Sequence, residues 1–483
     1  MQKSGCDPAA FLKHTKQEMI PMSDYQLIVI GAGPGGYVAA LHAAKQGLRT
    51  AVIENRDVGG TCLNRGCIPT KTLLHSSEII AGIKNGAPFG VGAEGIHFDM
   101  NAIFQRKRDV SAKLRGGIEG MFKAAKIDLL RGTGTILGTG RVLFKGEDGE
   151  KELTADHIMA ATGSVPARPP IPGLDLPGVV TSDELLEGCD HLYESIIIIG
   201  GGVIGVEFAT FYHDLGCNVT LIEGMDRLMP TLDREVGQNL GMILKKKGVA
   251  VHTNSLVSNV EQGEKGLRVN FKCKDQELSV EGECVLCAIG RKPYTGGLFA
   301  EGLAPEFDRA RLVVNDRYET SIPGVYAIGD VSAKVPLAHV ASAQGVDCVD
   351  LICGKEGGKV DINTIPSCIY CVPEIACVGL TADEAKAAGR SVASGKYVMF
   401  SNGKTVIKEG DRAFMKVVAD TETHEIVGAQ LMCEHSTDMI SELSTAIVNH
   451  LTVEQMLKVL RPHPTFEEGL TDALEDTLAK LNK

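Results

Sequence analysis

Two copies of one pattern, a strand, a glycine-rich turn, a helix and a second strand, limit the fold more than any other feature of the chain. The first copy contains residues 25–30, Gly31, Gly33, Gly36 and Glu54. In such a unit the first glycine permits a tight turn, the second lets the backbone approach a pyrophosphate, and the third lets the helix pack on the strand. The acid can accept hydrogen bonds from ribose hydroxyls. The first copy therefore predicts a dinucleotide site.

The second copy repeats the pattern with residues 195–199, Gly200, Gly202, Gly205 and Glu223. In both copies the acid lies 23 residues after the first glycine (31 to 54 and 200 to 223). Two sites predict two different dinucleotides, between which electrons could pass. A duplicated fold with one inactive site is the alternative, but both copies keep the glycines and the acid. A carboxylate at Glu223 favours NAD, because it repels the 2′-phosphate of NADP.

Cys62 and Cys67 follow directly after the first copy, within residues 59–71. Two cysteines five residues apart at the start of a predicted helix can approach each other across about one turn. A helix N-terminus and the nearby Arg65 or Lys71 would lower a thiol pKa, as thiolate exchange requires. Spacing alone favours a structural disulfide or two buried thiols. The position after a dinucleotide fold favours instead a redox-active disulfide that works with a flavin.

Two other cysteine pairs have CxxC spacing, Cys284–Cys287 and Cys368–Cys371. The two pairs are too far apart in sequence for a zinc ribbon. Cys284 and Cys287 also fall in a strand-like run, where an offset of three places side chains on opposite faces. Both pairs are predicted to be buried thiols, and no metal site is predicted.

Composition limits the partners and the compartment. A net charge of −12 argues against nucleic acid, because an acidic surface repels phosphate. No run of about 18 apolar residues is present, so no membrane span is predicted. Residues 1–22 lack the apolar centre of a signal peptide and are interpreted as an N-terminal extension. The dispersed cysteines are typical of a cytoplasmic protein, although the sequence does not distinguish the cytosol from an organelle.

With these motifs, the chain from about Tyr25 onward resembles the pyridine nucleotide–disulfide oxidoreductases, and most of all the members that oxidise dihydrolipoyl groups. The most specific segment is GGTCLNRGCIPTK at residues 59–71; glutathione-type relatives tend to carry CVNVGCVPKK. The resemblance implies FAD at the first glycine turn and NAD at the second. It also implies that Cys62 faces the dithiol substrate and Cys67 faces the flavin.

Shorter motifs fit the same family. Gly163 ends the segment that crosses from the FAD domain to the NAD domain, and Gly290 lies in the segment that returns. Asp330 matches the second flavin motif, in which the aspartate binds the ribityl chain. The resemblance also places the backbone of Ala338 near the flavin ring.

Near the C-terminus, His463 precedes a proline and Glu468 lies five residues further on. In the family this histidine is the acid–base catalyst, is oriented by the glutamate, and reaches the disulfide of the other subunit. The chemistry agrees, because a dithiol must lose protons to attack a disulfide and histidine titrates near neutral pH. A carboxylate on the other ring nitrogen fixes the tautomer.

Two further features concern single side chains. Lys71 and Glu207 resemble the family's charged pair beside the flavin ring, where a cation favours the reduced, anionic flavin. The alternative for Glu207 is an ordinary glutamate in the first turn of a helix. Family members commonly have His-Ala before the catalytic histidine, whereas this chain has Arg461 and Pro462, which should alter the approach to the thiols.

The predicted fold class is α/β, with two Rossmann-like dinucleotide-binding domains and a C-terminal α+β dimerisation domain. The predicted bounds are 23–165 and 291–360 for the FAD-binding domain, 166–290 for the NAD-binding domain, 361–483 for the dimerisation domain and 1–22 for the N-terminal extension.

The resemblance implies a homodimer that oxidises dihydrolipoyl groups with NAD+. Its partner would be the lipoyl domain of a 2-oxo acid dehydrogenase complex or the glycine cleavage H protein. The alternatives are another flavin disulfide reductase, of glutathione or mercuric type, or a mainly structural subunit of a multienzyme complex. Glu223 argues against a glutathione-type enzyme, which would be expected to carry basic residues there. A mercuric-type enzyme would be expected to end in a cysteine pair, whereas the last residues here are Leu-Asn-Lys.

Overall fold

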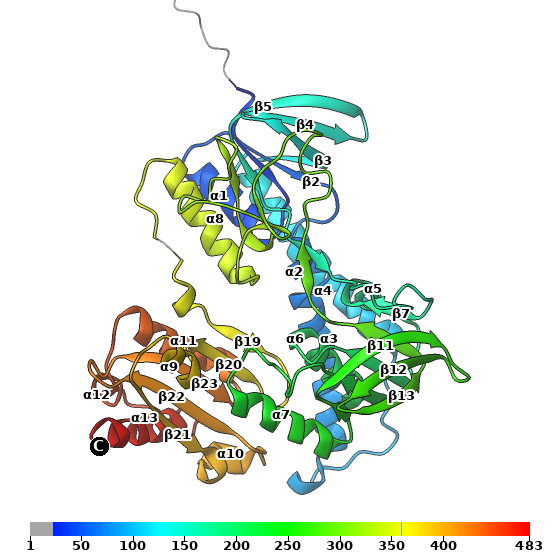
Figure 1. Cartoon of the computed structure of the whole chain (residues 1–483), viewed down its shortest axis with the longest axis vertical. Coiled ribbons are helices and arrows are strands. Elements are labelled where there is room, and N and C mark those ends of the chain that lie inside the picture. The colour runs from blue at the N-terminus through cyan, green and yellow to red at the C-terminus, as the bar shows by residue number, and fades with distance from the viewer. Residues whose placement is uncertain (1–22, 359) are drawn as a thin grey trace, which may run out of the picture.

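The computed structural model describes residues 23–358 and 360–483, so the predicted N-terminal extension lies outside the described residues. Three regions are visible in Figure 1. A sheet with α1 (Pro34–Lys45) and α8 (Ala338–Ile352) lies at the top, and the C-terminal region lies at the lower left. The region of α6 (Val203–Leu215), α7 (Arg234–Lys247) and β11–β13 (residues 255–282) lies at the lower right. No helix in the described part of the chain combines the length and the apolar character needed to cross a bilayer.

The first sheet contains strands from two separate stretches of the chain, residues 25–160 and 325–327. They are β1 (Tyr25–Ile30), β2 (Thr50–Glu54), β3 (Asp128–Gly138), β4 (Arg141–Gly146), β5 (Gly149–Ala160) and β18 (Val325–Ala327). Strands β3, β2, β1, β5 and β18 are parallel in that order, while β4 pairs antiparallel with β3 and β5. Because β18 follows the second nucleotide fold in sequence, the chain returns to complete this sheet.

Both faces of β1 are covered, which explains its nearly continuous apolar run. Leu27 and Val29 face a core that includes the alanines of α1 (Pro34–Lys45) and residues of α8 (Ala338–Ile352). Ile28 and Ile30 face a second core with residues of β3, β4 and β5. Helices α1 and α8 on one face, and strands β3, β4 and β5 on the other, thus hold the turn after β1 in place.

The second sheet is entirely parallel, in the order β10-β9-β8-β14-β7. Its strands are β7 (Val179–Thr181), β8 (Ser195–Ile199), β9 (Asn218–Ile222), β10 (Ala250–His252) and β14 (Cys284–Cys287). The helices with it are α5 (Ser182–Glu187), α6 (Val203–Leu215) and α7 (Arg234–Lys247), and the antiparallel meander is β11 (Ser255–Gln262), β12 (Leu267–Cys273) and β13 (Gln276–Gly282). Cys284 and Cys287 are both buried, in cores on opposite faces of this sheet, which confirms the prediction for that pair.

The two segments that connect the nucleotide folds lie side by side. β6 (Ser164–Pro166) pairs antiparallel with β15 (Arg291–Pro293). The short strands β16 (Phe307–Asp308) and β17 (Arg311–Leu312) also form a pair. The segment that enters the second nucleotide fold and the segment that leaves it are therefore hydrogen-bonded to each other. Both lie next to the first glycine turn.

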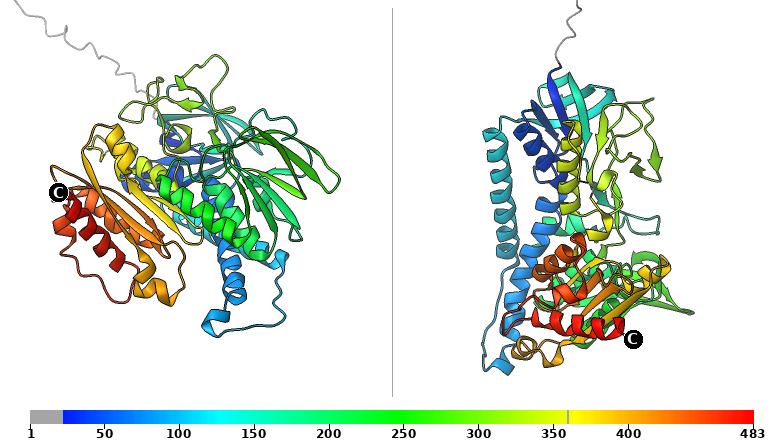
Figure 2. Two further views of the ribbon diagram at one scale, coloured as in Figure 1. Left: turned by 60° about the horizontal axis from the view of Figure 1, so that its bottom comes forward. Right: turned by 90° about the vertical axis from the view of Figure 1, so that its left-hand side faces the viewer.

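Helices α2 (Gly60–Asn64), α3 (Cys67–Lys84) and α4 (Met100–Ala124) follow the first nucleotide unit. Figure 2, right, shows α3 and α4 running along the length of the molecule. α3 packs on α4 and also on α6 of the second nucleotide fold. Residues 59–71, called the cysteine segment below, therefore lead into a helix that connects the first nucleotide fold with the second.

The C-terminal region is an antiparallel sheet in the order β19-β20-β23-β22-β21, with helices packed on it. Its elements are β19 (Ser367–Ile369), β20 (Ile375–Gly379), α9 (Ala382–Ala387), β21 (Val392–Val398), α10 (Gly403–Ile407), β22 (Phe414–Asp420), β23 (Ile426–Met432), α11 (Ser436–Val448), α12 (Val453–Met456) and α13 (Glu468–Leu481). Residues of α11 and α13 share one core with this sheet. The predicted fold class is confirmed, whereas the predicted domain bounds stay predictions.

Candidate active site

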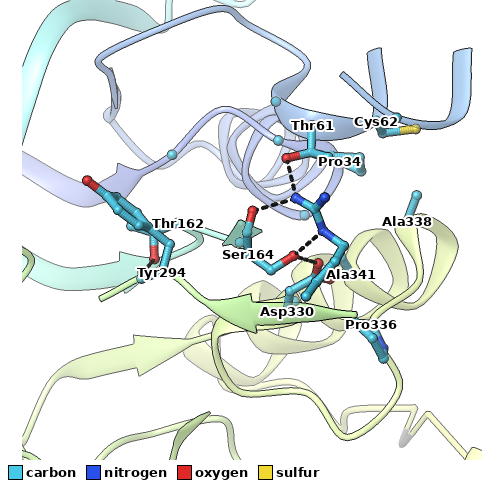
Figure 3. Close-up of a pocket in the computed structure, with 18 of the residues that line it drawn as sticks. Pro34, Thr61, Cys62, Thr162, Ser164, Tyr294, Asp330, Pro336, Ala338 and Ala341 are labelled. Carbon is cyan, nitrogen blue, oxygen red and sulfur yellow. Dashed lines mark hydrogen bonds between the residues drawn. The ribbon is translucent and has the colours of Figure 1, made fainter. Parts of the chain in front are cut away.

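A cavity of about 910 Å³ lies where the first glycine turn, the cysteine segment and the crossing strands meet (Figure 3). The predicted site residues that line it are Gly31, Gly33, Glu54, Cys62, Cys67, Lys71, Gly163, Glu207, Asp330 and Ala338. The remaining predicted residues do not line it: Gly36, Gly200, Gly202, Gly205, Glu223, Gly290, His463 and Glu468. The residues predicted to bind flavin, the two cysteines and Lys71 thus line one cavity. The second glycine turn and His463 lie outside it.

The first glycine turn shows which glycines the protein itself needs. A Cβ at Gly31 would lie 2.4 Å from the Ala161 carbonyl oxygen, and one at Gly36 would lie 1.9 Å from the Gly31 carbonyl oxygen. The φ angle of +105° at Gly31 also favours glycine. At Gly33, by contrast, the nearest atom is 3.9 Å away. Internal packing therefore does not require Gly33, which lines the cavity and leaves room for a phosphate to approach the backbone.

The second turn divides its glycines in the same way. A Cβ at Gly200 would lie 2.5 Å from the Ala288 carbonyl oxygen, and one at Gly205 would lie 1.9 Å from the Gly200 carbonyl oxygen. At Gly202 no atom lies within 4 Å. Both turns are followed by a helix N-terminus, which favours an anion. Both turns therefore fit a dinucleotide pyrophosphate.

The acids at the ends of β2 and β9 have a structural role that the sequence analysis missed. Each carboxylate accepts hydrogen bonds from backbone N–H groups, one of them in its own glycine turn. The contacts are Ala32 N (2.7 Å) and Arg56 N (2.8 Å) at Glu54, and Gly201 N (2.6 Å) and Met225 N (2.7 Å) at Glu223. Each carboxylate oxygen keeps a second lone pair for a ribose hydroxyl. The acid thus braces the turn as well as facing the nucleotide.

The sequence predicts that both cysteines lie on one helix, and the structure differs. Cys62 belongs to α2 and Cys67 is the first residue of α3, with Gly66 between them in a non-helical conformation. Residues five apart on an unbroken helix would point about 140° away from each other. The break at Gly66 corrects this, because it lets the two thiols contact each other.

Electrostatics separates the two thiols. The hydrogen bond from Cys62 and the Lys71 ammonium lower the pKa of the Cys67 thiol to about 7. The same hydrogen bond, together with burial, raises the pKa of Cys62. Cys67 also lies exposed in the cavity, whereas Cys62 is half-buried. This difference favours Cys67 as the thiolate of the reduced pair and Cys62 as the thiol that hydrogen-bonds to it.

Lys71, Glu207 and Tyr370 meet at one point from three parts of the chain. The Lys71 Nζ lies 2.7 Å from each carboxylate oxygen of Glu207, and Glu207 is only 3% exposed. The Tyr370 N–H donates to Glu207 Oε1 at 3.1 Å, and its ring centroid lies 4.8 Å from the Lys71 Nζ. Glu207 is therefore not an ordinary exposed helix residue, because it fixes the cation next to Cys67.

Replacing Lys71 with methionine is expected to raise the pKa of Cys67, since the cation that favours the thiolate is lost. The pH at which the reduced protein develops long-wavelength thiolate–flavin absorbance should rise by about one unit or more. Lys113→Met, on the exposed side of α4, is the matched control and should leave this midpoint in place. An unchanged midpoint in Lys71→Met would contradict the role given to the lysine.

Ser164, Arg291 and Thr61 form a network that no sequence motif indicated. Figure 3 labels Ser164 and Thr61, with dashed lines for the hydrogen bonds. The Ser164 hydroxyl donates to Asp330 Oδ2 at 2.5 Å and accepts from Arg291 Nε at 2.9 Å. Arg291 Nη2 also contacts Thr61 Oγ1 at 3.4 Å. Only the pairing of β6 with β15 brings residues so distant in sequence together, so no local pattern could have revealed this network.

His463 and Glu468 are paired on the C-terminal region. His463 Nδ1 lies 2.9 Å from Glu468 Oε1, and the histidine side chain is 77% exposed. Hydrogen bonds from the Thr465 N–H and from His463 lower the pKa of Glu468. The carboxylate thus holds one ring nitrogen and leaves Nε2 for another molecule.

Arg461 is turned into the C-terminal region. Its guanidinium donates to Glu442 Oε1 at 2.5 Å and to Thr471 Oγ1 at 3.0 Å, and its side chain is 3% exposed. The arginine that replaces the family's usual histidine therefore anchors the loop before His463.

The second CxxC pair, Cys368 and Cys371, is at least partly buried, with Cys371 buried and Cys368 partly buried. Burial raises the pKa of Cys284 to about 12 and also raises the pKa of Cys371. In the described part of the chain, no group of three or more His, Cys, Asp or Glu side chains is arranged to hold a metal ion.

Comparison with known families matches residues 25–345 to the pyridine nucleotide-disulphide oxidoreductases, and residues 365–474 to their dimerisation domain. The chain belongs to the pyridine nucleotide-disulphide oxidoreductases. Its cofactors are accordingly FAD and NAD, as the family resemblance implied for the two glycine turns. The dimerisation domain supports a homodimer.

Individual relatives of this oxidoreductase cover almost its whole length. It is 38% identical over 464 residues to a dihydrolipoyl dehydrogenase of Bacillus subtilis (strain 168), across 93% of this chain and 97% of the relative. It is 37% identical over 447 residues to a dihydrolipoyl dehydrogenase of Chlamydia pneumoniae, across 92% and 95%. Among solved structures it is similar to LpdA from Mycobacterium tuberculosis, with a TM-score of 0.85 and 26% identity over 93% of this chain and 99% of that one.

Proposed function

We propose that this oxidoreductase is a homodimeric, cytoplasmic enzyme that oxidises dihydrolipoyl groups to lipoyl groups with NAD+. The observation that carries the proposal is the contact between Cys62 and Cys67 at the wall of the FAD cavity, with the Cys67 thiol pKa lowered to about 7. The relatives named dihydrolipoyl dehydrogenase support the choice of dithiol. Glu223 supports NAD+ rather than NADP+.

The thiol chemistry follows from the residues of the chain. His463 of the partner subunit accepts a proton from a substrate thiol, and Glu468 keeps the ring in the tautomer that can do so. The substrate thiolate attacks the Cys62 sulfur, the Cys62–Cys67 bond breaks, and Cys67 leaves as a thiolate. The second substrate thiol then attacks the substrate sulfur of the mixed disulfide and its proton passes to Cys62. The cyclic lipoyl disulfide forms, Cys62 is released as a thiol, and His463 of the partner subunit keeps the first proton. FAD, when bound, supplies the two-electron chemistry that connects this dithiol with NAD+.

Lys71 and the N-terminus of α3 stabilise the leaving thiolate. A leaving thiol of low pKa departs more readily in exchange, and Cys67 is the member of the pair with the lower pKa. This asymmetry supports Cys62 as the sulfur that substrate attacks. We propose the lipoyl domain of a 2-oxo acid dehydrogenase complex, or the glycine cleavage H protein, as the carrier of the dithiol.

A steady-state assay of the purified dimer with dihydrolipoamide tests the proposal. Turnover is expected with NAD+, and kcat/KM for NADP+ should be lower by about tenfold or more, since the Glu223 carboxylate and a 2′-phosphate repel each other. The comparison reactions contain glutathione disulfide with NADPH, and mercuric ion with NADPH. Activity in a comparison reaction, together with none on dihydrolipoamide, would overturn the assignment.

A further inference from the structure

Arg291 contacts three functional parts of the molecule at once. It lies in β15, lines the cavity, and has a side chain that is 17% exposed. Its contacts are Nε to Ser164 Oγ (2.9 Å), Nη2 to the Ser164 carbonyl oxygen (2.7 Å), Nη2 to Thr61 Oγ1 (3.4 Å) and Nη1 to Asp183 Oδ1 (3.7 Å). They belong to the crossing segment, the cysteine segment and helix α5. One rigid, planar side chain therefore connects all three.

The direction of the hydrogen bonds is fixed by chemistry. A guanidinium can only donate, so the Ser164 oxygen accepts from Arg291 and must use its single hydrogen elsewhere. That hydrogen goes to Asp330 Oδ2, at 2.5 Å. Ser164 is buried, so water does not compete for these positions. Arg291 thereby sets the orientation of the Asp330 carboxylate, which lines the FAD cavity.

On its other side the guanidinium reaches the residue before Cys62. Thr61 lines the same cavity, and Figure 3 shows it above Ser164 and Asp330. The α2 helix that carries Thr61 and Cys62 is only five residues long. A short helix followed by a break has little stability of its own, so its position depends on tertiary contacts. Arg115 holds its last residue, Asn64 (2.9 Å), and Arg291 holds Thr61, next to Cys62.

The charge of Arg291 is matched from the second nucleotide fold. Asp183 on α5 has an 18% exposed side chain, and its Oδ1 is a buried atom without a hydrogen bond that faces Arg291 Nη1 at 3.7 Å. Arg65, between the two cysteines, lies 4.0 Å from the other oxygen of Asp183. The carboxylate thus holds two arginines that border the cysteine segment.

We propose that Arg291 is a positioning residue that orients Asp330 toward FAD through Ser164 and holds Cys62 in place through Thr61. The inference rests on the proposed function only in taking FAD to bind in this cavity. It does not depend on the identity of the dithiol substrate, so the assay with dihydrolipoamide can fail while this inference stands.

The test compares Arg291→Met, Arg291→Lys, Ser164→Ala and the control Lys292→Met as dimeric holoproteins. Lys292 is the exposed neighbour on the same strand, and its side chain points to the other side. The first readout is the rate of FAD release after dilution, followed by flavin fluorescence. The second is the intensity of long-wavelength thiolate–flavin absorbance per bound FAD after two-electron reduction.

Arg291→Met is expected to release FAD about tenfold faster and to lose part of the absorbance, since charge-assisted hydrogen bonds to both segments are removed. Arg291→Lys should not restore either value, because one ammonium cannot reproduce the fork that reaches Ser164 and Thr61 together. Ser164→Ala should accelerate FAD release but keep the absorbance per FAD, because the contact with Thr61 remains.

Three results would overturn the proposal. In the first, Arg291→Met behaves like Lys292→Met in both measurements. In the second, Arg291→Lys restores both, which would mean that charge alone matters. In the third, Ser164→Ala retains FAD like the wild type. If Arg291→Met fails to fold, the Ser164→Ala and Arg291→Lys results still decide the matter.

Discussion

Cys62→Ser is expected to lower kcat for dithiol oxidation by about 10⁴-fold or more, because the sulfur that substrate attacks is missing. Cys67→Ser should be equally inactive, since no disulfide can form. The two variants should differ in their spectra. Cys62→Ser keeps the Cys67 thiolate and should retain long-wavelength absorbance, whereas Cys67→Ser should lose it. The measurements are steady-state turnover and the absorbance spectrum of each holoprotein.

Cys353→Ser is the matched control for both changes. Cys353 follows α8, is partly exposed, and does not line the cavity. It should turn over like the wild type. Retention of the absorbance by Cys67→Ser would show that the flavin-facing thiol has been assigned to the wrong residue. If Cys62→Ser turned over about as fast as the control, the disulfide would not take part in the reaction.

His463→Gln is expected to lower kcat by about 10²- to 10⁴-fold, because the substrate thiol would lose its general base. Glu468→Gln should have a smaller effect, since the ring remains and only its orientation is weakened. His450 offers a close control: it is an exposed histidine whose Nδ1 lies 3.2 Å from Glu425. His450→Gln should leave kcat unchanged. A similar loss in both histidine variants would point to a general structural effect.

Mixed dimers test whether the site uses two subunits. A dimer of one Cys62→Ser subunit and one His463→Gln subunit contains one site in which both residues are intact, if the histidine acts across the interface. Random exchange of the two inactive dimers should then restore about a quarter of wild-type activity, since half of the dimers are mixed and each has one such site. If both residues act within one subunit, no activity returns.

The glycine turns could be predicted from sequence because their requirement is local and steric. A Cβ at Gly31 or Gly200 would collide with a neighbouring strand, and the left-handed φ angles exclude most other residues. The acids Glu54 and Glu223 were found by the same local spacing. The family and the cofactors followed from these motifs and are confirmed.

Features that depend on tertiary contacts could not be predicted. Gly66 is a residue type at which helices commonly end, but the sequence does not show that a second helix begins at once and brings Cys67 into contact with Cys62. Ser164 and Arg291 are 127 residues apart and come together only through the pairing of β6 with β15. A single serine or arginine in a connecting segment carries no signal until that pairing is known.

The most direct test of the central claim is to map which thiols appear when the oxidised holoprotein receives one equivalent of dihydrolipoamide. The sample is alkylated with iodoacetamide without unfolding and analysed by peptide mass spectrometry, next to an untreated sample. We predict that new alkylation is confined to the peptide that contains Cys62 and Cys67. New alkylation at any other cysteine, or none at this pair while dihydrolipoamide is oxidised, would contradict the account.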